Sequence, residues 1–100
     1  MFKVKNKQYE FKFTTDRVAL VEATVKHGIM SELYGSNGMF SLQTVAACFQ
    51  FAGREAGKEE YLTQEDGSVL MDEALKACGY ATIVLEIQET LKADLPFLFQ

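Results

Sequence analysis

Apolar and polar residues alternate through Phe2–Phe13, and this alternation constrains the fold more than any other feature of the chain. It predicts two antiparallel strands with a tight turn at Asn6-Lys7, where Asn tolerates the positive φ that such a turn requires. This register places Lys3 opposite Glu10, which is a charge-complementary pair. Since two strands are marginally stable by themselves, helices must cover the apolar face of the hairpin. That face consists of Phe2, Val4, Tyr9, Phe11 and Phe13.

Helical periodicity dominates the rest of the chain, because apolar residues recur there at spacings of three and four. Thr14 or Thr15, Ser41 and Thr63 can cap the first three helices, since a hydroxyl oxygen accepts hydrogen bonds from the free amides of a first turn. We therefore expect one domain over residues 1–100 of the α+β class, mostly α, with an N-terminal two-stranded antiparallel hairpin (residues 2–13) packed on about four helices. The helices are predicted over about residues 15–33, 42–56, 64–78 and 80–94.

The second predicted helix and the C-terminal tail are the most apolar parts of the chain. The helix opens with LQTVAACFQFAG, which has no charged residue, so we expect it to be the central, mostly buried helix. The alternative is that part of it faces a partner chain. The tail, residues 95–100, follows a helix that ends by Asp94, because Pro96 disfavours the α conformation at Leu95. An apolar tail either docks on the core or forms an exposed contact surface, and we favour docking.

The charge of the chain is uneven. Residues 1–13 carry +3, from four lysines and one glutamate, whereas the remainder carries −7, from six basic and thirteen acidic residues. Nucleic-acid binding needs clustered cations, so the excess of acid argues against such a partner, and we expect the hairpin lysines to form a solvated face. The charge-free stretch 33–53 is too polar to span a membrane, and the N-terminus lacks the apolar region of a signal peptide. We therefore expect a soluble, cytoplasmic protein.

No catalytic or metal-binding constellation is found in the sequence. His27 is the only histidine and has no second ligand at helical spacing, so neither a metal site nor a nucleophile triad is predicted. Cys48 and Cys78 lie in apolar helical patterns and are expected to be buried thiols without a disulfide. Leu62–Glu73 partly matches a calcium-binding loop, but leucine replaces the first ligand. We predict a protein without catalytic activity, cofactor or metal.

The segment Phe2–Lys26, FKVKNKQYEFKFTTDRVALVEATVK, resembles the start of the small tail assembly chaperones of long-tailed bacteriophages. That family opens with a strand, an Asn-Gly-Lys-like turn, a Tyr-x-(Leu/Phe)-Lys-Phe strand and a helix. This chain departs from the pattern in having Asn6 in place of the usual turn glycine. The later segments SLQTVAACFQFAG, LTQEDGSVLMDEAL and YATIVLEIQETL also look like the family, so the resemblance covers nearly the whole chain as a pattern.

The resemblance implies a non-enzymatic role in tail morphogenesis. It implies that the protein binds the tape-measure protein, keeps it soluble and assists polymerisation of the tail-tube protein around it. The host bacterial cytoplasm is the implied location, and the mature virion would not contain the protein. The resemblance also identifies the chain as the short form, with a longer form made by ribosomal frameshifting as a further partner.

Helix-in-groove recognition of a long helical client needs exposed apolar side chains and no catalytic residue. The runner-up function is a structural or regulatory homo-oligomer subunit that self-associates through the charge-free stretch 33–53. For the three candidate contact residues nearest the second helix, a core position is the alternative, and for Phe49 it is the better interpretation. The candidate protein-contact residues are Phe40, Phe49, Phe51, Phe97, Leu98 and Phe99.

Overall fold

The computed structural model describes residues 1–100 and confirms the predicted α+β, mostly α class. Its elements are three short strands, five α-helices and a final 3-10 turn. In chain order they are β1 (Phe2–Val4), β2 (Lys7–Phe11), α1 (Thr15–Val25), α2 (Ile29–Gly35), α3 (Leu42–Ala52), β3 (Gly53–Glu55), α4 (Gln64–Cys78), α5 (Tyr80–Asp94) and η1 (Pro96–Phe99).

The N-terminal hairpin forms as predicted, but its register differs by two residues. Lys3 lies opposite Gln8, so the predicted Lys3–Glu10 pair is wrong. The turn residues are Lys5 and Asn6, both in the left-handed region with φ of 49° and 69°. Because a shift of two residues preserves the side-chain alternation, the predicted apolar face is retained. Phe2, Val4, Phe11 and Phe13 are buried on it and Tyr9 is half-buried.

A third strand, β3, pairs antiparallel with β2 and was predicted as the end of a helix. The helix α3 ends at Ala52, because the chain becomes extended at Gly53 with φ −79° and ψ 140°. A Cβ at Gly53 would lie only 2.8 Å from the carbonyl oxygen of Phe49, so this crossing of the chain requires glycine. The strand brings Arg54 opposite Glu10, and the Arg54 Nε donates to the Glu10 carboxylate at 2.5 Å.

The predicted helix over residues 15–33 is two helices, α1 and α2, joined by a sharp bend. Lys26 closes α1 in the left-handed conformation, with φ 63°, and donates its N–H to the Glu22 carbonyl at 2.7 Å. Gly28 is extended and precedes α2 without offering a side-chain cap. The Glu22 carboxylate supplies that cap instead, by accepting the Ile29 N–H at 2.8 Å. We call Lys26, His27 and Gly28 the joint.

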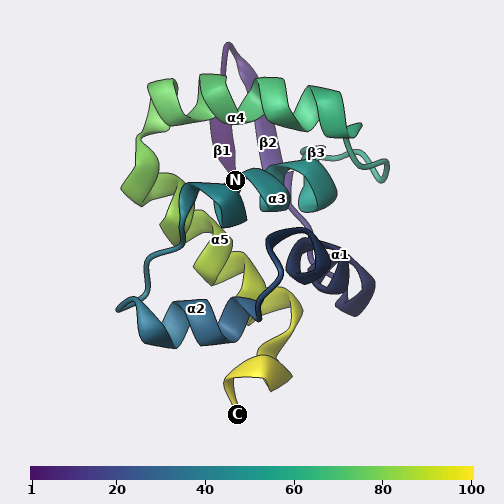
Figure 1. Cartoon of the computed structure of the whole chain (residues 1–100). Coiled ribbons are helices and arrows are strands. Elements are labelled where there is room, and N and C mark those ends of the chain that lie inside the picture. Colours follow the sequence, from purple (N-terminus) through teal and green to yellow (C-terminus); the bar gives the residue numbers. More distant parts are fainter.

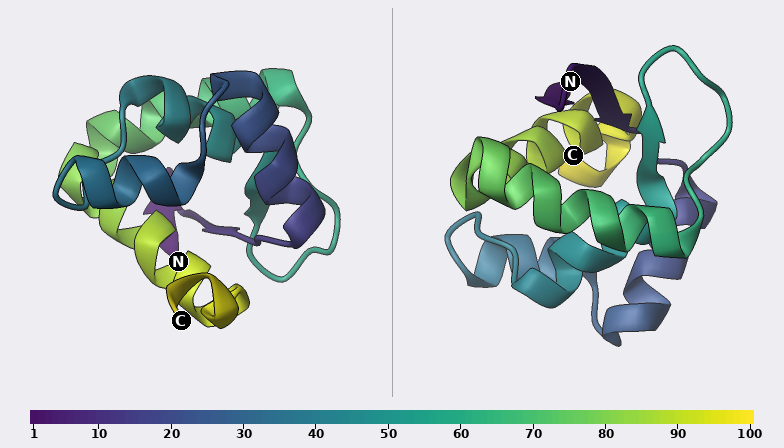
Figure 2. Two further views of the ribbon diagram at one scale, coloured as in Figure 1. Left: turned by 60° about the horizontal axis from the view of Figure 1, so that its bottom comes forward. Right: turned by 90° about the horizontal axis from the view of Figure 1, so that it is seen from above.

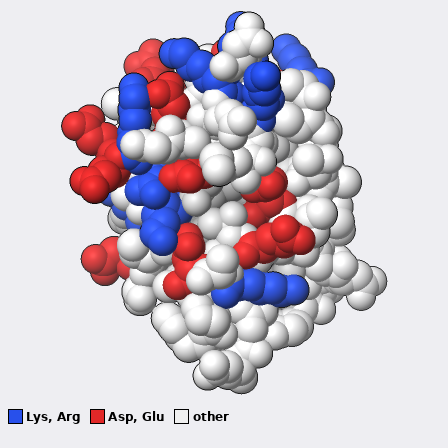
Figure 3. Space-filling model, turned by 180° about the vertical axis from the view of Figure 1, so that it is seen from behind, with Lys and Arg blue, Asp and Glu red and all other residues white.

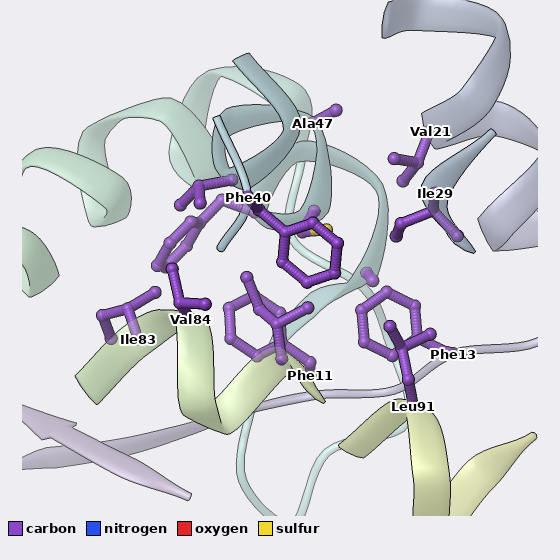
Figure 4. Packing of buried hydrophobic residues seen from close by; sticks show 14 of the residues in the cluster. Phe11, Phe13, Val21, Ile29, Phe40, Ala47, Ile83, Val84 and Leu91 are labelled. Carbon is purple, nitrogen blue, oxygen red and sulfur yellow. The ribbon is translucent and has the colours of Figure 1, made fainter. Parts of the chain in front are cut away.

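The helices enclose one core of 20 buried apolar residues. α4 lies at one end of the molecule and η1 with the C-terminus lies at the other, while the sheet forms the back in Figure 1. Seen from above in Figure 2, α4 has the hairpin on one side and α1, α2 and α3 on the other. Figure 4 shows Phe11 and Phe13, two residues apart at the end of the hairpin, and Phe40, from the loop before α3, in the same interior space as Val84 and Leu91 of α5. α3 is the central helix, as predicted, with α1 and α4 packed on it.

The start of α4 explains the partial match to a calcium-binding loop. Thr63 caps the helix, since its hydroxyl accepts the Asp66 N–H at 3.1 Å. Most of the Leu62–Glu73 segment is therefore regular helix. Gly67, which fell on the glycine position of such a loop, is buried where α4 crosses α3. A Cβ at Gly67 would lie 2.5 Å from the carbonyl oxygen of Phe49, so the two helix backbones touch there.

The hairpin lysines do more than form a solvated face. Lys5 pairs with Glu73 of α4 at 3.0 Å, and Lys12 pairs with Asp94 of α5 at 3.1 Å. The N-terminal amine also lies 3.0 Å from the Glu86 carboxylate. Figure 3 shows basic and acidic side chains interleaved over this side of the molecule, and none at the end opposite α4. The basic hairpin is thus partly neutralised by the acidic body that it covers.

Asp94 provides one of the main connections between the hairpin and the helices. It is the last residue of α5, where a negative charge is unfavourable with respect to the helix dipole. Its Oδ2 accepts the Phe13 N–H at 2.9 Å and its Oδ1 accepts Lys12 Nζ at 3.1 Å. The tertiary hydrogen bonds therefore offset the unfavourable position of the carboxylate.

Replacing Asp94 by alanine should lower the free energy of unfolding by about 1–3 kcal/mol, because the Phe13 amide would lose its acceptor. Asp94→Asn keeps an oxygen for that amide and removes only the charge, so it should cost less than about 1 kcal/mol, since the pair is only part-buried and solvent at the Lys12 ammonium screens it. Urea unfolding of the two variants measures the difference. Equal losses would show that the ion pair, and not the amide hydrogen bond, holds the hairpin on α5.

Candidate protein-interaction site

An apolar groove of about 180 Å³ lies between the C-terminal tail and the first two helices. We call it the tail groove. One side of α1 and the start of α2, which are consecutive in the sequence, form it together with the distant last residues of the chain. Only Thr15 and Glu22 among its lining residues are polar. The others are Val18, Ala19, Ile29, Met30, Leu95, Phe97 and Leu98.

The tail is held in place by the end of α5. The Leu95 N–H donates to the Leu91 carbonyl at 2.8 Å, and the Leu98 N–H donates to the Leu95 carbonyl at 3.1 Å. Pro96 opens the resulting 3-10 turn, where its fixed φ fits and its missing N–H leaves no donor unsatisfied. Leu95 is buried, whereas Phe97 remains 55% exposed at the groove. The tail is therefore docked in part, through Leu95 and the half-buried Leu98 and Phe99, and the Phe97 ring is left accessible to solvent.

The other wall of the tail groove depends on the joint. Glu32 of α2 accepts hydrogen bonds from three groups, of which the Ser41 N–H belongs to the N-cap residue of α3. The second donor is the Thr44 hydroxyl, at 2.5 Å, and the third is the His27 ring, whose Nε2 lies 2.5 Å from the same oxygen. One carboxylate thus connects the joint to the first turn of α3, where a negative charge is favourable.

These hydrogen bonds change the titration of both partners. The hydrogen bond to Glu32 is the main cause that raises the pKa of His27 above its ordinary value of 6.5. Burial acts to raise the pKa of Glu32, but the hydrogen bonds from Ser41, Thr44 and His27 outweigh it and hold that pKa below 4.5. His27 and Glu32 therefore form an ion pair around pH 6. The pair serves to connect the joint with α2 and, through Glu32, with α3.

The structure places the six candidate contact residues differently. Phe40 and Phe49 are core residues, 1% and 0% exposed, so Phe40 is wrong as a contact candidate, whereas the core position preferred for Phe49 is confirmed. Phe51 is half-buried, and its carbonyl accepts the Arg17 guanidinium at 3.1 Å. Of the three tail residues, Phe97 and Leu98 line the tail groove. The third, Phe99, is half-buried against the core beneath the Lys92 ammonium, 5.8 Å from its ring centre.

Sequence reasoning missed the opposite wall of the tail groove. Val18 and Ile29 belong to the predicted core stripe of a single helix, so no groove was expected beside them. The bend at the joint breaks that helix, and Ile29 and Met30 then line the tail groove together with α1. Gly28 was the one available signal, because glycine is unfavourable inside a helix.

A second hollow, which we call the hairpin cleft, lies between the hairpin and α4 and has a volume of about 420 Å³. Half of its lining residues are charged, and several of them already have partners. Lys5 reaches Glu73 at 3.0 Å and Lys7 reaches Glu55 at 3.7 Å. Since a client would have to displace paired and hydrated charges there, the smaller tail groove is the better site for an apolar segment.

No group of three or more His, Cys, Asp or Glu side chains is arranged to hold a metal ion. None of the helices combines the length and the apolar character needed to cross a membrane. Cys48 and Cys78 are free thiols; Cys48 is fully buried and Cys78 is partly buried. Comparisons of the chain with models of protein families, with curated proteins and with solved structures find no match.

Proposed function

We propose that this protein is a non-catalytic tail assembly chaperone of a long-tailed bacteriophage, which binds the tape-measure protein and assists polymerisation of the tail-tube protein. The sequence resemblance over Phe2–Lys26 and the later helices supports the choice of family. The tail groove supports the mode of action, because an amphipathic helix can place apolar side chains in it. The observation that carries the proposal is the open, apolar tail groove with Phe97 55% exposed at its edge.

The charge distribution fits a protein that must present such a surface and remain soluble. The formal net charge is −4, and charged side chains cover the side of the hairpin seen in Figure 3, away from the end that carries the tail. Net charge of this size opposes self-association of a small domain. The end that carries the tail is free of charged side chains on the face shown in Figure 3.

Co-expression with the tape-measure protein of the same phage tests the proposal. The tape-measure protein should move from the insoluble to the soluble fraction when this chain is present and should co-purify with it. A tape-measure protein whose solubility does not change, and which does not co-purify, would contradict the proposal. An unrelated acidic protein of similar size serves as the control for non-specific effects.

A structural or regulatory homo-oligomer subunit is the second candidate function. It is favoured by exposed apolar side chains from the charge-free stretch 33–53, among them Tyr34 at 71% and Leu42 at 58% exposure. Burial of Phe40 and Phe49 removes two other aromatic residues of that stretch from any interface. Sedimentation at increasing concentration separates the two functions, because a tight closed oligomer without a client would favour this candidate.

A further inference from the structure

We infer that the contact between His27 and Glu32 is a proton-controlled tie, which tightens the wall of the tail groove while His27 carries its proton and loosens it when His27 is neutral. The inference rests on the proposed function only in treating the tail groove as the working surface. The tie itself is a property of the protein without a client.

The geometry connects three elements through one side chain. His27 lies in the joint, and its Nε2 is 2.5 Å from Glu32 Oε2. That oxygen also accepts the Thr44 hydroxyl, while Oε1 accepts the Ser41 N–H at the start of α3. The Thr44 side chain is fully buried, so the carboxylate is anchored on α3. Protonated His27 fixes the joint to this anchored carboxylate by a hydrogen bond between opposite charges. Neutral His27 can still donate its Nε2–H to the carboxylate, but the attraction between opposite charges is lost, so the contact is weaker.

The joint leads directly into the tail groove. Ile29 and Met30 line the groove, two and three residues after His27. Gly28, which lies between His27 and Ile29, offers no side-chain cap to α2. The wall is held from α1 by Glu22, whose carboxylate accepts the Ile29 N–H at 2.8 Å, and from α3 by the hydrogen bonds of Ser41 and Thr44 to Glu32. The His27–Glu32 contact adds a third connection, which fixes the joint to α2. Of these three connections, only the His27–Glu32 contact contains a group that titrates near neutral pH.

The charged and titratable surroundings of the pair are few. Glu32 and, more weakly, Glu22 act on His27 as negative charges. Tyr80 of α5 and Cys48 of α3 feel the charge of Glu32, but burial raises the pKa of both groups, so they stay neutral. Apart from His27 itself, no basic side chain is among the main causes of either shift. The pH response near neutrality therefore belongs to His27.

The direction of the response follows from the two shifts. The pKa of His27 is raised above 6.5. Its contribution to the stability of the folded state is therefore fully present below pH 6.5 and is lost as the pH rises through the folded-state pKa. The pKa of Glu32 is lowered below 4.5. Its contribution to the stability of the folded state is therefore present above pH 4.5 and is lost as the pH falls through the folded-state pKa. The tie is complete between pH 4.5 and 6.5 and loosens on the alkaline side.

Nuclear magnetic resonance of the protein alone tests the inference, from about pH 5 to about pH 9, the range in which histidine changes charge. The methyl signals of Ile29 and Met30 should shift with the same midpoint as the His27 ring signals. Amide exchange at Ile29, corrected for its intrinsic pH dependence, should become about two- to fivefold faster across that midpoint, as loss of one exposed ion pair predicts.

Two variants make the test specific. His27→Gln should abolish the titration of the Ile29 and Met30 signals. Glu22→Gln should speed amide exchange at Ile29 at every pH, but the increase in exchange across the His27 midpoint should remain. Methyl signals that stay constant while the His27 ring titrates, or that still titrate in His27→Gln, would overturn the inference. Because no client is used, that outcome would leave the co-expression test of the proposed function unaffected.

Discussion

Substituting Gly67 by alanine should destabilise the protein by about 2–3 kcal/mol, which is the upper range for overpacking a core. At roughly 4–8 °C per kcal/mol for a domain of this size, the thermal midpoint should fall by roughly 10–20 °C. The cause is the crossing of α3 and α4, where an added Cβ would lie 2.5 Å from the Phe49 carbonyl oxygen and 2.9 Å from its carbon. The obstacle is helix backbone, which cannot move aside as a flexible side chain can.

Helix propensity alone would predict that Gly67→Ala stabilises the protein, because it favours alanine over glycine by about 1 kcal/mol. The expected change in stability has the opposite sign. Gly35 supplies the matched control, because it also lies in a helix and a Cβ added there meets nothing within 4 Å. Gly35→Ala should be neutral or slightly stabilising. Thermal unfolding of both variants decides the matter. A Gly67→Ala protein as stable as Gly35→Ala would contradict the close crossing of the two helices.

Truncating Phe49 to alanine should cost about 3–5 kcal/mol, the range found when a buried phenylalanine leaves a cavity. Phe49 is 0% exposed and joins α3 to the sheet. Its ring meets Phe11 edge-to-face with 5.0 Å between ring centres and meets Phe2 in the same way at 5.8 Å. Such aromatic pairs contribute beyond the area that they bury. Chemical unfolding in urea measures the loss.

Phe51 is the matched control for Phe49, since it is the same residue type two positions along the same helix but only half-buried. Phe51→Ala should cost less than half as much. Equal losses would mean that the two rings are buried alike, contrary to the structure. The comparison also separates core from contact residues among the aromatic side chains of the charge-free stretch.

Much of the fold was predictable because its signals are local. Thr14, Ser41 and Thr63 each accept an amide of the first turn, as their positions before apolar runs indicated. The predicted bounds of α4 and α5, residues 64–78 and 80–94, are those of the structure. Alternation in the hairpin correctly predicted which side chains face the core. Each of these features depends on residues within a few positions of one another.

The errors concern features that depend on distant contacts. The apolar spacing of Val21, Val25 and Ile29 continues through the joint, so periodicity alone could not reveal that α1 ends there. The strand β3 is three residues long and has no detectable period, and its pairing with β2 joins residues more than forty positions apart. That pairing and packing against α4 also determine the hairpin register, for which the turn residues gave no clear glycine signal.

Of the two walls of the tail groove, the sequence predicted only the one formed by the C-terminal tail. Phe97 and Leu98 were expected from the apolar tail, because large apolar residues near a terminus either dock or remain exposed. The opposite wall, with Ile29 and Met30, exists only because the joint turns α2 away from the line of α1. Burial of Phe40 resulted from the loop before α3 packing on α5, where Gln88 donates to the Gly38 carbonyl. Neither arrangement has a local sequence signal.

Affinity for the tape-measure protein, measured on Phe97 variants, tests the proposed function most directly. Phe97→Ser removes an exposed ring, so the fold should persist, while binding should weaken about 10- to 100-fold, as loss of one buried phenylalanine contact predicts. Tyr34→Ser is the matched control, because Tyr34 is 71% exposed, is aromatic and lies outside the tail groove. Wild-type protein and Tyr34→Ser should bind alike and Phe97→Ser should bind weakly. Equal binding by all three, or no binding by the wild type, would contradict a client site in the tail groove.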